Sequence, residues 1–334
     1  MAPDASHPST ARPASPATPD TLKHAVKDKV DKVEGGATGG TRQSADAGSF
    51  GFDSDAELLA LTRPPKFEAD EEGKEKERAY LKERLAGALR IFAREGLDHH
   101  VAGHLTVRDP GDPTTFWVNP FGLSFACMTV SDLILVSHDG KVIGGGKPGR
   151  RVVNRAGFLI HSAIHKARPD VNAICHSHSL YGKTWSTLGI PLPFTTQDSC
   201  SFYKSLALLP SFGGVVLSSR EGDRIAQALG AGRAIVLQNH GILTAGSSID
   251  SAVASYILLE TQCKVQLLAL SASAGLNSLP SAHPCAPERS VYPIEIDEEE
   301  VKFTAGTGGE ELGYFVASPY FQRIEKEEGH EYRQ

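Results

Sequence analysis

Hydrophobic and polar positions along the chain predict a long polar start followed by regular structure. Residues 1–60 are rich in alanine, proline, serine, threonine and aspartate. Such a segment cannot bury enough apolar surface to offset the entropy of ordering, so we predict a disordered tail. Over residues 67–95 leucine and phenylalanine recur at about every fourth position, and Gly96 follows as a candidate C-cap. This pattern predicts a helix where the folded domain begins.

Short apolar segments separated by turn-forming residues come next. Residues 104–108, 115–118 and 133–136 have strand character, which predicts antiparallel β structure. Residues 155–167 place their apolar side chains on one helical face, and Pro169 ends that helix. A further strand is predicted over residues 171–175.

Helices and strands alternate in the second half of the chain. Strands are predicted over residues 213–217 and 234–237, with a helix over residues 221–229 between them. Residues 249–274 have a helical period with no breaker before Gly275. The alternation predicts an α/β fold, a mixed sheet covered by helices.

The same pattern divides the chain into parts. The folded domain is predicted to span residues 67–275. After it the helical pattern weakens, and residues 276–334 form a C-terminal extension that we expect to pack on the domain or on a neighbouring subunit.

Composition indicates which partners the protein binds and in which compartment it lies. The 34 basic and 40 acidic residues give a formal charge of -6, which argues against a nucleic-acid binder. The five cysteines are odd in number and include no C-x-x-C pair, so we expect reduced thiols and a cytoplasmic protein. Because the chain has no run of 18 apolar residues and no secretory signal pattern, no membrane anchor is predicted.

Candidate chemistry begins with the segment ICHSHS at residues 174–179. Residues i and i+2 of a strand point to the same face, so His176 and His178 would present two imidazoles side by side. His240 follows the strand over residues 234–237 and is a third candidate ligand. Three histidines leave coordination positions open, as a catalytic Zn²⁺ or Fe²⁺ site requires. The alternative is that all three are ordinary polar residues at strand ends and turns.

Two more histidines lie on the helix over residues 155–167. His161 and His165 are i, i+4 neighbours, but no glutamate completes the metalloprotease pattern H-E-x-x-H. We expect His165 to face solvent. His161 is placed to support a metal ligand or to transfer a proton.

Four motifs together are similar to those of the class II aldolase and adducin head-domain family. They are AGHLTVRDP at 102–110, IHSAIHKARPDVNAICHSHS at 160–179, TQD at 196–198 and AIVLQNHGILTAG at 234–246. The resemblance implies a three-layer α/β/α sandwich, assembled as a homotetramer with sites at subunit interfaces. It also implies that His176, His178 and His240 bind a divalent metal, with zinc expected and Fe(II) as the alternative.

The resemblance also exposes departures from the aldolase pattern. The position of the aldolases' acid/base glutamate is Gly157 in this chain. Arg155 and Ala156 stand where serines help to bind phosphate, and Gly103-His104 stands where aldolases tend to carry Gly-Asn. These departures weaken the case for aldol cleavage of sugar phosphates.

Other side chains are candidates for the missing roles. His104, Arg108 and Arg155 are candidate substrate-binding residues, although either arginine can instead form structural ion pairs. His161 and Tyr203 are candidate acid/base groups, and the alternative for Tyr203 is a packed aromatic side chain.

Retention of the three histidines favours an enzyme over an inactive scaffold. The favoured hypothesis is a metal-dependent lyase that acts on a small carbonyl or carboxylate substrate by C–C cleavage, decarboxylation or a related step. The alternatives are a non-haem iron oxygenase of the same fold and a non-enzymatic, adducin-like interaction module.

Overall fold

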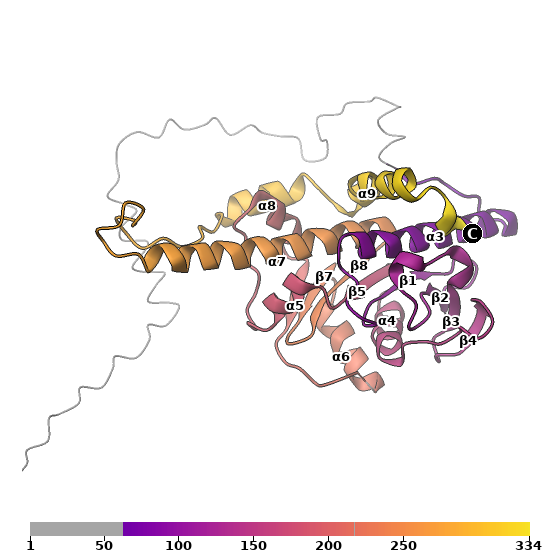
Figure 1. The fold of residues 1–334 in the computed structure, drawn as a ribbon. Coiled ribbons are helices and arrows are strands. Elements are labelled where there is room, and N and C mark those ends of the chain that lie inside the picture. The colour runs from indigo at the N-terminus through magenta and orange to yellow at the C-terminus, as the bar shows by residue number, and fades with distance from the viewer. Residues whose placement is uncertain (1–62, 217) are drawn as a thin grey trace, which may run out of the picture. The chain divides into compact units, whose positions relative to one another are not determined.

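The computed structural model describes residues 63–216 and 218–334, so the tail predicted over residues 1–60 lies outside the described residues. An eight-stranded sheet lies between helices on both faces (Figure 1). The strands are β1 His104–Arg108, β2 Thr115–Val118, β3 Ile134–Ser137, β4 Val142–Gly145, β5 Ala173–Ser177, β6 Leu206–Leu209, β7 Ala234–Leu237 and β8 Gly241–Gly246. The helices of the described residues are α3 Glu71–Arg94, α4 Arg155–Ala167, α5 Leu180–Ser186, α6 Ser219–Leu229, α7 Ile249–Asn277, α8 Glu298–Gly306 and α9 Gly313–Glu328.

The sheet is mixed, as predicted. Its order is β4-β3-β2-β1-β5-β8-β7-β6, and only β6 and β7 pair in parallel among the described strands. The predicted antiparallel structure around β1, β2 and β3 is confirmed. Strand β5 lies in the middle of this order, between β1 and β8.

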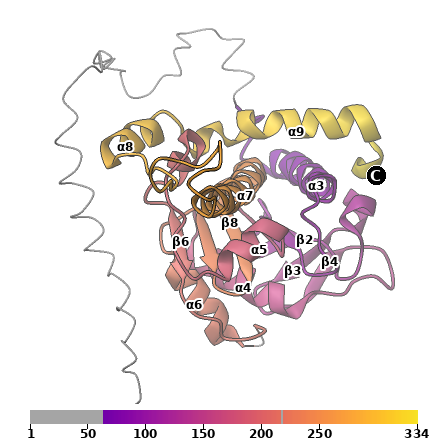
Figure 2. The same ribbon diagram turned by 60° about the vertical axis from the view of Figure 1, so that its left-hand side comes forward.

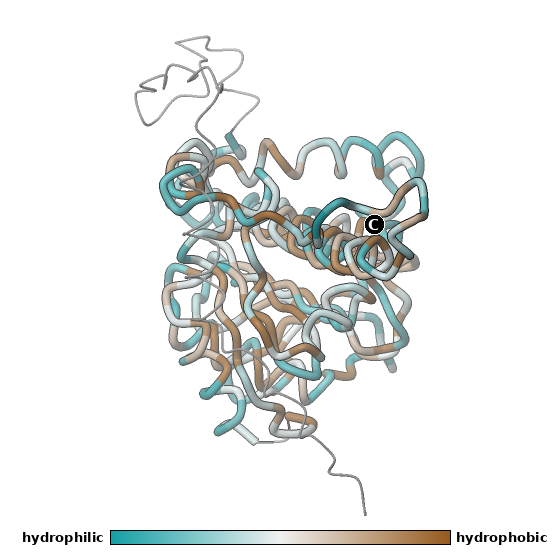
Figure 3. Tube along the Cα trace, turned by 90° about the vertical axis from the view of Figure 1, so that its left-hand side faces the viewer, coloured by the Kyte–Doolittle hydropathy of each residue, from teal (hydrophilic) through white to brown (hydrophobic). Residues whose placement is uncertain are grey.

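Two apolar layers cover the sheet. Helices α3, α5 and α7 pack on one face, while α4 and α6 pack on the other (Figure 2). Alternation along β5 sends Ala173 and Cys175 into the first layer and Ile174 into the second. Figure 3 shows hydrophobic residues gathered along the central strands and the long helix beside them. The predicted three-layer α/β/α sandwich is confirmed.

One predicted strand was wrong. Residues 213–216 form bends and irregular backbone, and residue 217 is not described. Gly214 has a φ of 88°, outside the β region, and the Val215 side chain is 71% exposed. One edge of the sheet is β6, which the sequence pattern did not predict, and the other edge is β4.

The C-terminal extension includes helices α8 and α9; α9 packs on α3 and α7, and α8 packs on the 3-10 turn Gln197–Phe202. Arg84 of α3 places its guanidinium 3.2 Å from the ring centroid of Phe321 on α9. Arg90 of α3 donates to the Glu328 carboxylate at 3.0 Å. None of the described helices is long and apolar enough to cross a membrane.

Candidate metal centre

The three predicted ligands meet where β5 ends and where β7 turns into β8. His176 lies in β5, His178 follows that strand, and His240 lies in the turn before Gly241. Asn239, with a φ of 58°, makes the turn tight. One ligand atom from each histidine lies within 4.8 Å of the others. Such a cluster of imidazoles is a candidate site for a zinc ion, which binds histidine nitrogens.

Hydrogen bonding and burial prepare His176 to act as a ligand. Its Nδ1 lies 2.8 Å from the carbonyl oxygen of Ile242, an acceptor, so Nδ1 carries the proton and Nε2 keeps a free lone pair. Burial lowers the pKa of His176, and it lowers the pKa of His240 to about 4. Both imidazoles are therefore neutral near pH 7, which is the form that binds a metal. The donor set fits a divalent ion with open coordination positions.

His104 lies beside this triad and in front of Gly157. In the sheet His104 pairs with His176, and the two ring centroids are 5.0 Å apart. A Cβ atom at position 157 would lie 2.5–2.6 Å from the His104 ring, too close for any side chain. The His104 imidazole thus occupies the space that a side chain at position 157 would need.

The ring nitrogens of His104 are buried. Neither ring nitrogen has a hydrogen-bond partner of normal geometry among the described residues, and the residue is only 4% exposed. Burial lowers its pKa to about 3, so the ring is neutral and can donate one hydrogen bond and accept another.

Behind His104 lies a chain of two more buried histidines. The ring centroid of His161 is 4.3 Å from that of His104, and its Nδ1 is 2.8 Å from Thr106 Oγ1. The same hydroxyl is 3.0 Å from His165 Nε2. Our expectation that His165 faces solvent was wrong, because it is 1% exposed. The apolar face of α4 was evident from the sequence. The sequence did not show that the face carrying His165 packs against Thr106 of β1.

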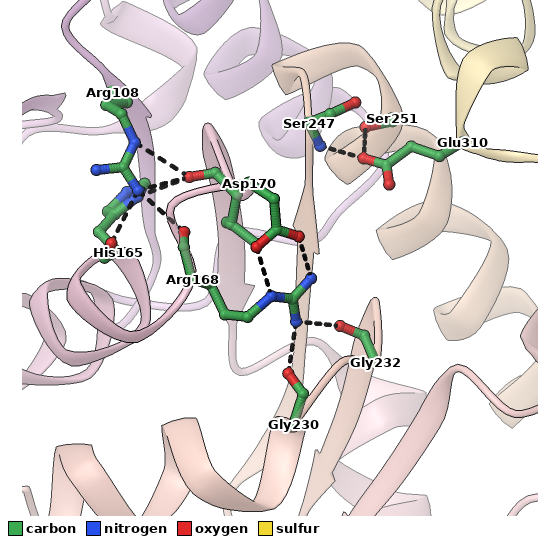
Figure 4. Close-up of polar contacts among 10 residues, drawn as sticks. Arg108, His165, Arg168, Asp170, Gly230, Gly232, Ser247, Ser251 and Glu310 are labelled. Carbon is green, nitrogen blue, oxygen red and sulfur yellow. Dashed lines mark hydrogen bonds and ion pairs between the residues drawn. The ribbon is translucent and has the colours of Figure 1, made fainter. Parts of the chain in front are cut away.

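The two candidate arginines differ in their surroundings. The Arg108 guanidinium donates to backbone carbonyl oxygens, including those of His165 at 2.8 Å and Arg168 at 3.1 Å (Figure 4). It therefore ties β1 to the end of α4, and these contacts favour its structural role. Arg155 is the first residue of α4 and is exposed.

Tyr203 is held by the C-terminal extension. Its hydroxyl donates to Glu298 Oε1 at 2.9 Å, and its ring packs edge-on against Phe194. These contacts match the packed-aromatic alternative, and its catalytic role stays a prediction.

Sequence reasoning missed a polar group on α7, behind β5. Tyr256 is fully buried, and its hydroxyl lies 2.8 Å from Ser177 Oγ. Glu260 is 7% exposed and accepts a hydrogen bond from Ser179 Oγ at 2.6 Å. Polar residues four apart in an otherwise apolar helical stretch are the signal that could have identified them.

The family to which the chain belongs is given by comparison with known proteins. The family model "Class II Aldolase and Adducin N-terminal domain" matches residues 83–267. This chain belongs to that family. The resemblance drawn from the four motifs is therefore confirmed.

Three members illustrate the functions found in the family. A solved structure described as L-fuculose 1-phosphate aldolase from Glaciozyma antarctica PI12 is 57% identical, with a TM-score of 0.72, and the match covers 83% of this chain and 99% of that chain. The 4-hydroxy-3-prenylphenylpyruvate oxygenase/4-hydroxy-3-prenylbenzoate synthase of Streptomyces roseochromogenus subsp. oscitans is 43% identical over 65% of this chain and 76% of its own length. Decarboxylase NovR of Streptomyces niveus is 44% identical over 62% of this chain and 74% of its own length.

Proposed function

We propose that this protein is a metal-dependent lyase that cleaves a C–C bond, by decarboxylation or a related step, in a small carbonyl or carboxylate substrate. The observation that carries the proposal is the convergence of His176, His178 and His240 within 4.8 Å. When bound there, a divalent ion supplies Lewis-acid polarisation of a substrate carbonyl. We propose zinc as that ion.

The substrate class follows from the group beside the triad. His104 is neutral and can hydrogen-bond a substrate oxygen, whereas a carboxylate on α4 at position 157 would meet the His104 ring. This difference favours a keto acid or a related carboxylate over a sugar phosphate. The relatives named Decarboxylase NovR and 4-hydroxy-3-prenylphenylpyruvate oxygenase/4-hydroxy-3-prenylbenzoate synthase support the same class, whereas the solved structure described as L-fuculose 1-phosphate aldolase carries the name of a sugar-phosphate enzyme.

Two further residues complete the proposed site. Arg155 is exposed at the start of α4, where a helix N-terminus favours anions, so we propose that it binds an anionic part of the substrate. His161 stands behind His104 and is the proposed acid/base partner of that ring. The catalytic role predicted for Tyr203 has less support, because its hydroxyl is bound to Glu298.

Assembly and location are part of the proposal. We infer a homotetramer from the family resemblance and a cytoplasmic location from the cysteines, which are free among the described residues. Sedimentation of the full chain at several concentrations measures the assembly.

The test of the proposal is a substrate panel assayed with and without metal. Purified protein loaded with Zn²⁺ is incubated without oxygen with small hydroxy acids, keto acids and aryl keto acids, and carbonyl products and CO₂ are measured. We expect metal-dependent product from a carboxylate substrate, loss of product in His178→Ala, and full activity in the control His330→Ala, which alters an exposed histidine.

The second candidate function is a non-haem iron oxygenase, favoured by the relative that carries that activity in its name. Three imidazoles can hold Fe²⁺ as well as Zn²⁺. Product formation that requires Fe²⁺ and consumes oxygen stoichiometrically would replace the lyase by this oxygenase. A protein that binds metal no better than its His176→Ala and His240→Ala variants would fit the adducin-like interaction module instead.

A further inference from the structure

Behind the metal ligands, α7 presents a buried carboxylate to the segment that carries His178. Glu260 Oε2 accepts hydrogen bonds from Ser179 Oγ at 2.6 Å and from the backbone amide of Gly182 at 2.7 Å. Its Oε1 accepts from the amide of Tyr181 at 2.8 Å. An ionised carboxylate is an acceptor-only group, so three donors suit it well.

This contact needs two unusual features of the sequence. Gly182 lets α5 approach closely, because a Cβ there would lie 2.9 Å from Glu260 Oε2 and 2.8 Å from Ile242. The carboxylate itself is buried and makes no ion pair with a described residue. Burying such a charge is costly unless hydrogen bonds satisfy it. Because burying this carboxylate costs free energy, its position next to the segment that carries His178 suggests a function at the metal centre.

Tyr256, one helical turn before Glu260, binds the same segment. Its hydroxyl donates to the Ser177 carbonyl oxygen at 3.0 Å and lies 3.0 Å from Ser179 Oγ. The residues on both sides of His178 are therefore fixed from α7. His176, by contrast, is oriented from β8 through the carbonyl oxygen of Ile242.

We propose that Glu260 is a positioning residue of the metal centre, one that fixes His178 through Ser179 and the start of α5 and places a negative charge behind the ligands. This inference rests on the proposed function, since it needs the triad to bind a metal. Groups that orient metal ligands change metal affinity by about 10- to 100-fold when they are altered.

The test compares two buried carboxylates of the same helix. In Glu260→Gln, an amide nitrogen replaces one oxygen and opposes the N–H of Tyr181 or Gly182. Asp250→Asn is the matched control. Asp250 is also a buried carboxylate on α7, but it lies in the first turn of that helix and pairs with Arg84 of α3. Both variants should lower the thermal unfolding temperature of the metal-free protein.

Metal affinity separates the two variants. Titration with Co²⁺, followed by its visible absorption, should give Glu260→Gln an affinity about 10- to 100-fold weaker than wild type, with an altered spectrum. Asp250→Asn should bind Co²⁺ as the wild type does. Equal affinity and an unchanged spectrum in Glu260→Gln would overturn the inference while leaving the proposed function intact.

Two further outcomes are decisive. If the wild type binds no Co²⁺ at all, the proposed function fails and this inference fails with it. If Glu260→Gln does not fold, Ser179→Ala replaces it, because this variant removes one donor and leaves both backbone amides on the carboxylate. Weaker Co²⁺ binding by Ser179→Ala then supports the inference, and wild-type binding refutes it.

Discussion

The imidazole of His104 rests against Gly157, in space that any side chain at position 157 would have to share. A Cβ atom there would lie 2.5–2.6 Å from three ring atoms of His104. The two residues come from β1 and α4, far apart in sequence, and their contact places the imidazole beside His176. The absence of a side chain at Gly157 thus leaves room for the neutral His104 imidazole, which lies next to the triad.

A double-mutant cycle tests this coupling. Gly157→Ala should lower the free energy of unfolding by about 1–3 kcal/mol, because overpacking displaces the His104 ring. In a His104→Ala background the same change should be neutral or stabilising by up to about 1 kcal/mol, since alanine is the better helix former. Denaturant unfolding of the four proteins measures the coupling. A Gly157→Ala penalty that persists without the imidazole would show that the ring is not its cause.

The two arginines should separate stability from substrate binding. Arg108→Lys should lower the free energy of unfolding by about 1–3 kcal/mol, because the compact ammonium group of lysine cannot reach carbonyl oxygens as widely spaced as those that the planar guanidinium binds. Its kcat/KM, measured on folded protein, should stay near the wild-type value.

Arg155→Ala is the counterpart on α4. Because Arg155 is exposed, we expect an unchanged unfolding temperature and a KM raised about tenfold for an anionic substrate. If Arg155→Ala leaves KM unchanged, or Arg108→Lys raises it, the assignment of the substrate-binding arginine is wrong.

Buried His165 makes the stability of the metal-free protein depend on pH. Burial, aided by the positive charge of Arg108, lowers the pKa of His165 to about 3, below the roughly 6.5 of an unfolded chain. Between these values the unfolded state binds a proton that the folded state does not, so stability falls as the pH is lowered.

His165→Gln should remove this contribution. The slope of unfolding free energy against pH between 4 and 6, measured with EDTA, should decrease by about 1.4 kcal/mol per pH unit. His330→Gln, an exposed control, should keep the wild-type slope. An unchanged slope in His165→Gln would mean that His165 is protonated in the folded protein.

Local patterns predicted most of the elements that hold the site. The predicted helix over residues 155–167 has the bounds of α4, because apolar periodicity and breakers act within a few residues. The strand predicted over residues 171–175 is β5, which lies two residues later at Ala173–Ser177. The position of the triad also followed, since His176 and His178 lie at the end of β5 and His240 lies shortly after β7. What periodicity could not reveal was the partner of each buried polar group. His165, His104 and Glu260 are defined by contacts between distant elements, which no local pattern encodes.

The strand predicted over residues 213–217 is an error of another kind, because an element was predicted that residues 213–216 do not form. Its apolar composition suited a buried strand, yet Gly214 takes a left-handed conformation and Val215 faces outward. The strand that pairs with β7 at this edge of the sheet is β6. Its register depends on pairing with β7 rather than on hydropathy.

The central claim is that His176, His178 and His240 hold one divalent metal ion. The most direct measurement is the bound-metal content of the full chain, purified without added metal and then loaded with Zn²⁺, for the wild type and the three single alanine variants. We predict about one tightly bound ion per wild-type chain and loss of that ion in each variant, while His330→Ala retains it. Variants that bind as much metal as the wild type would contradict the claim.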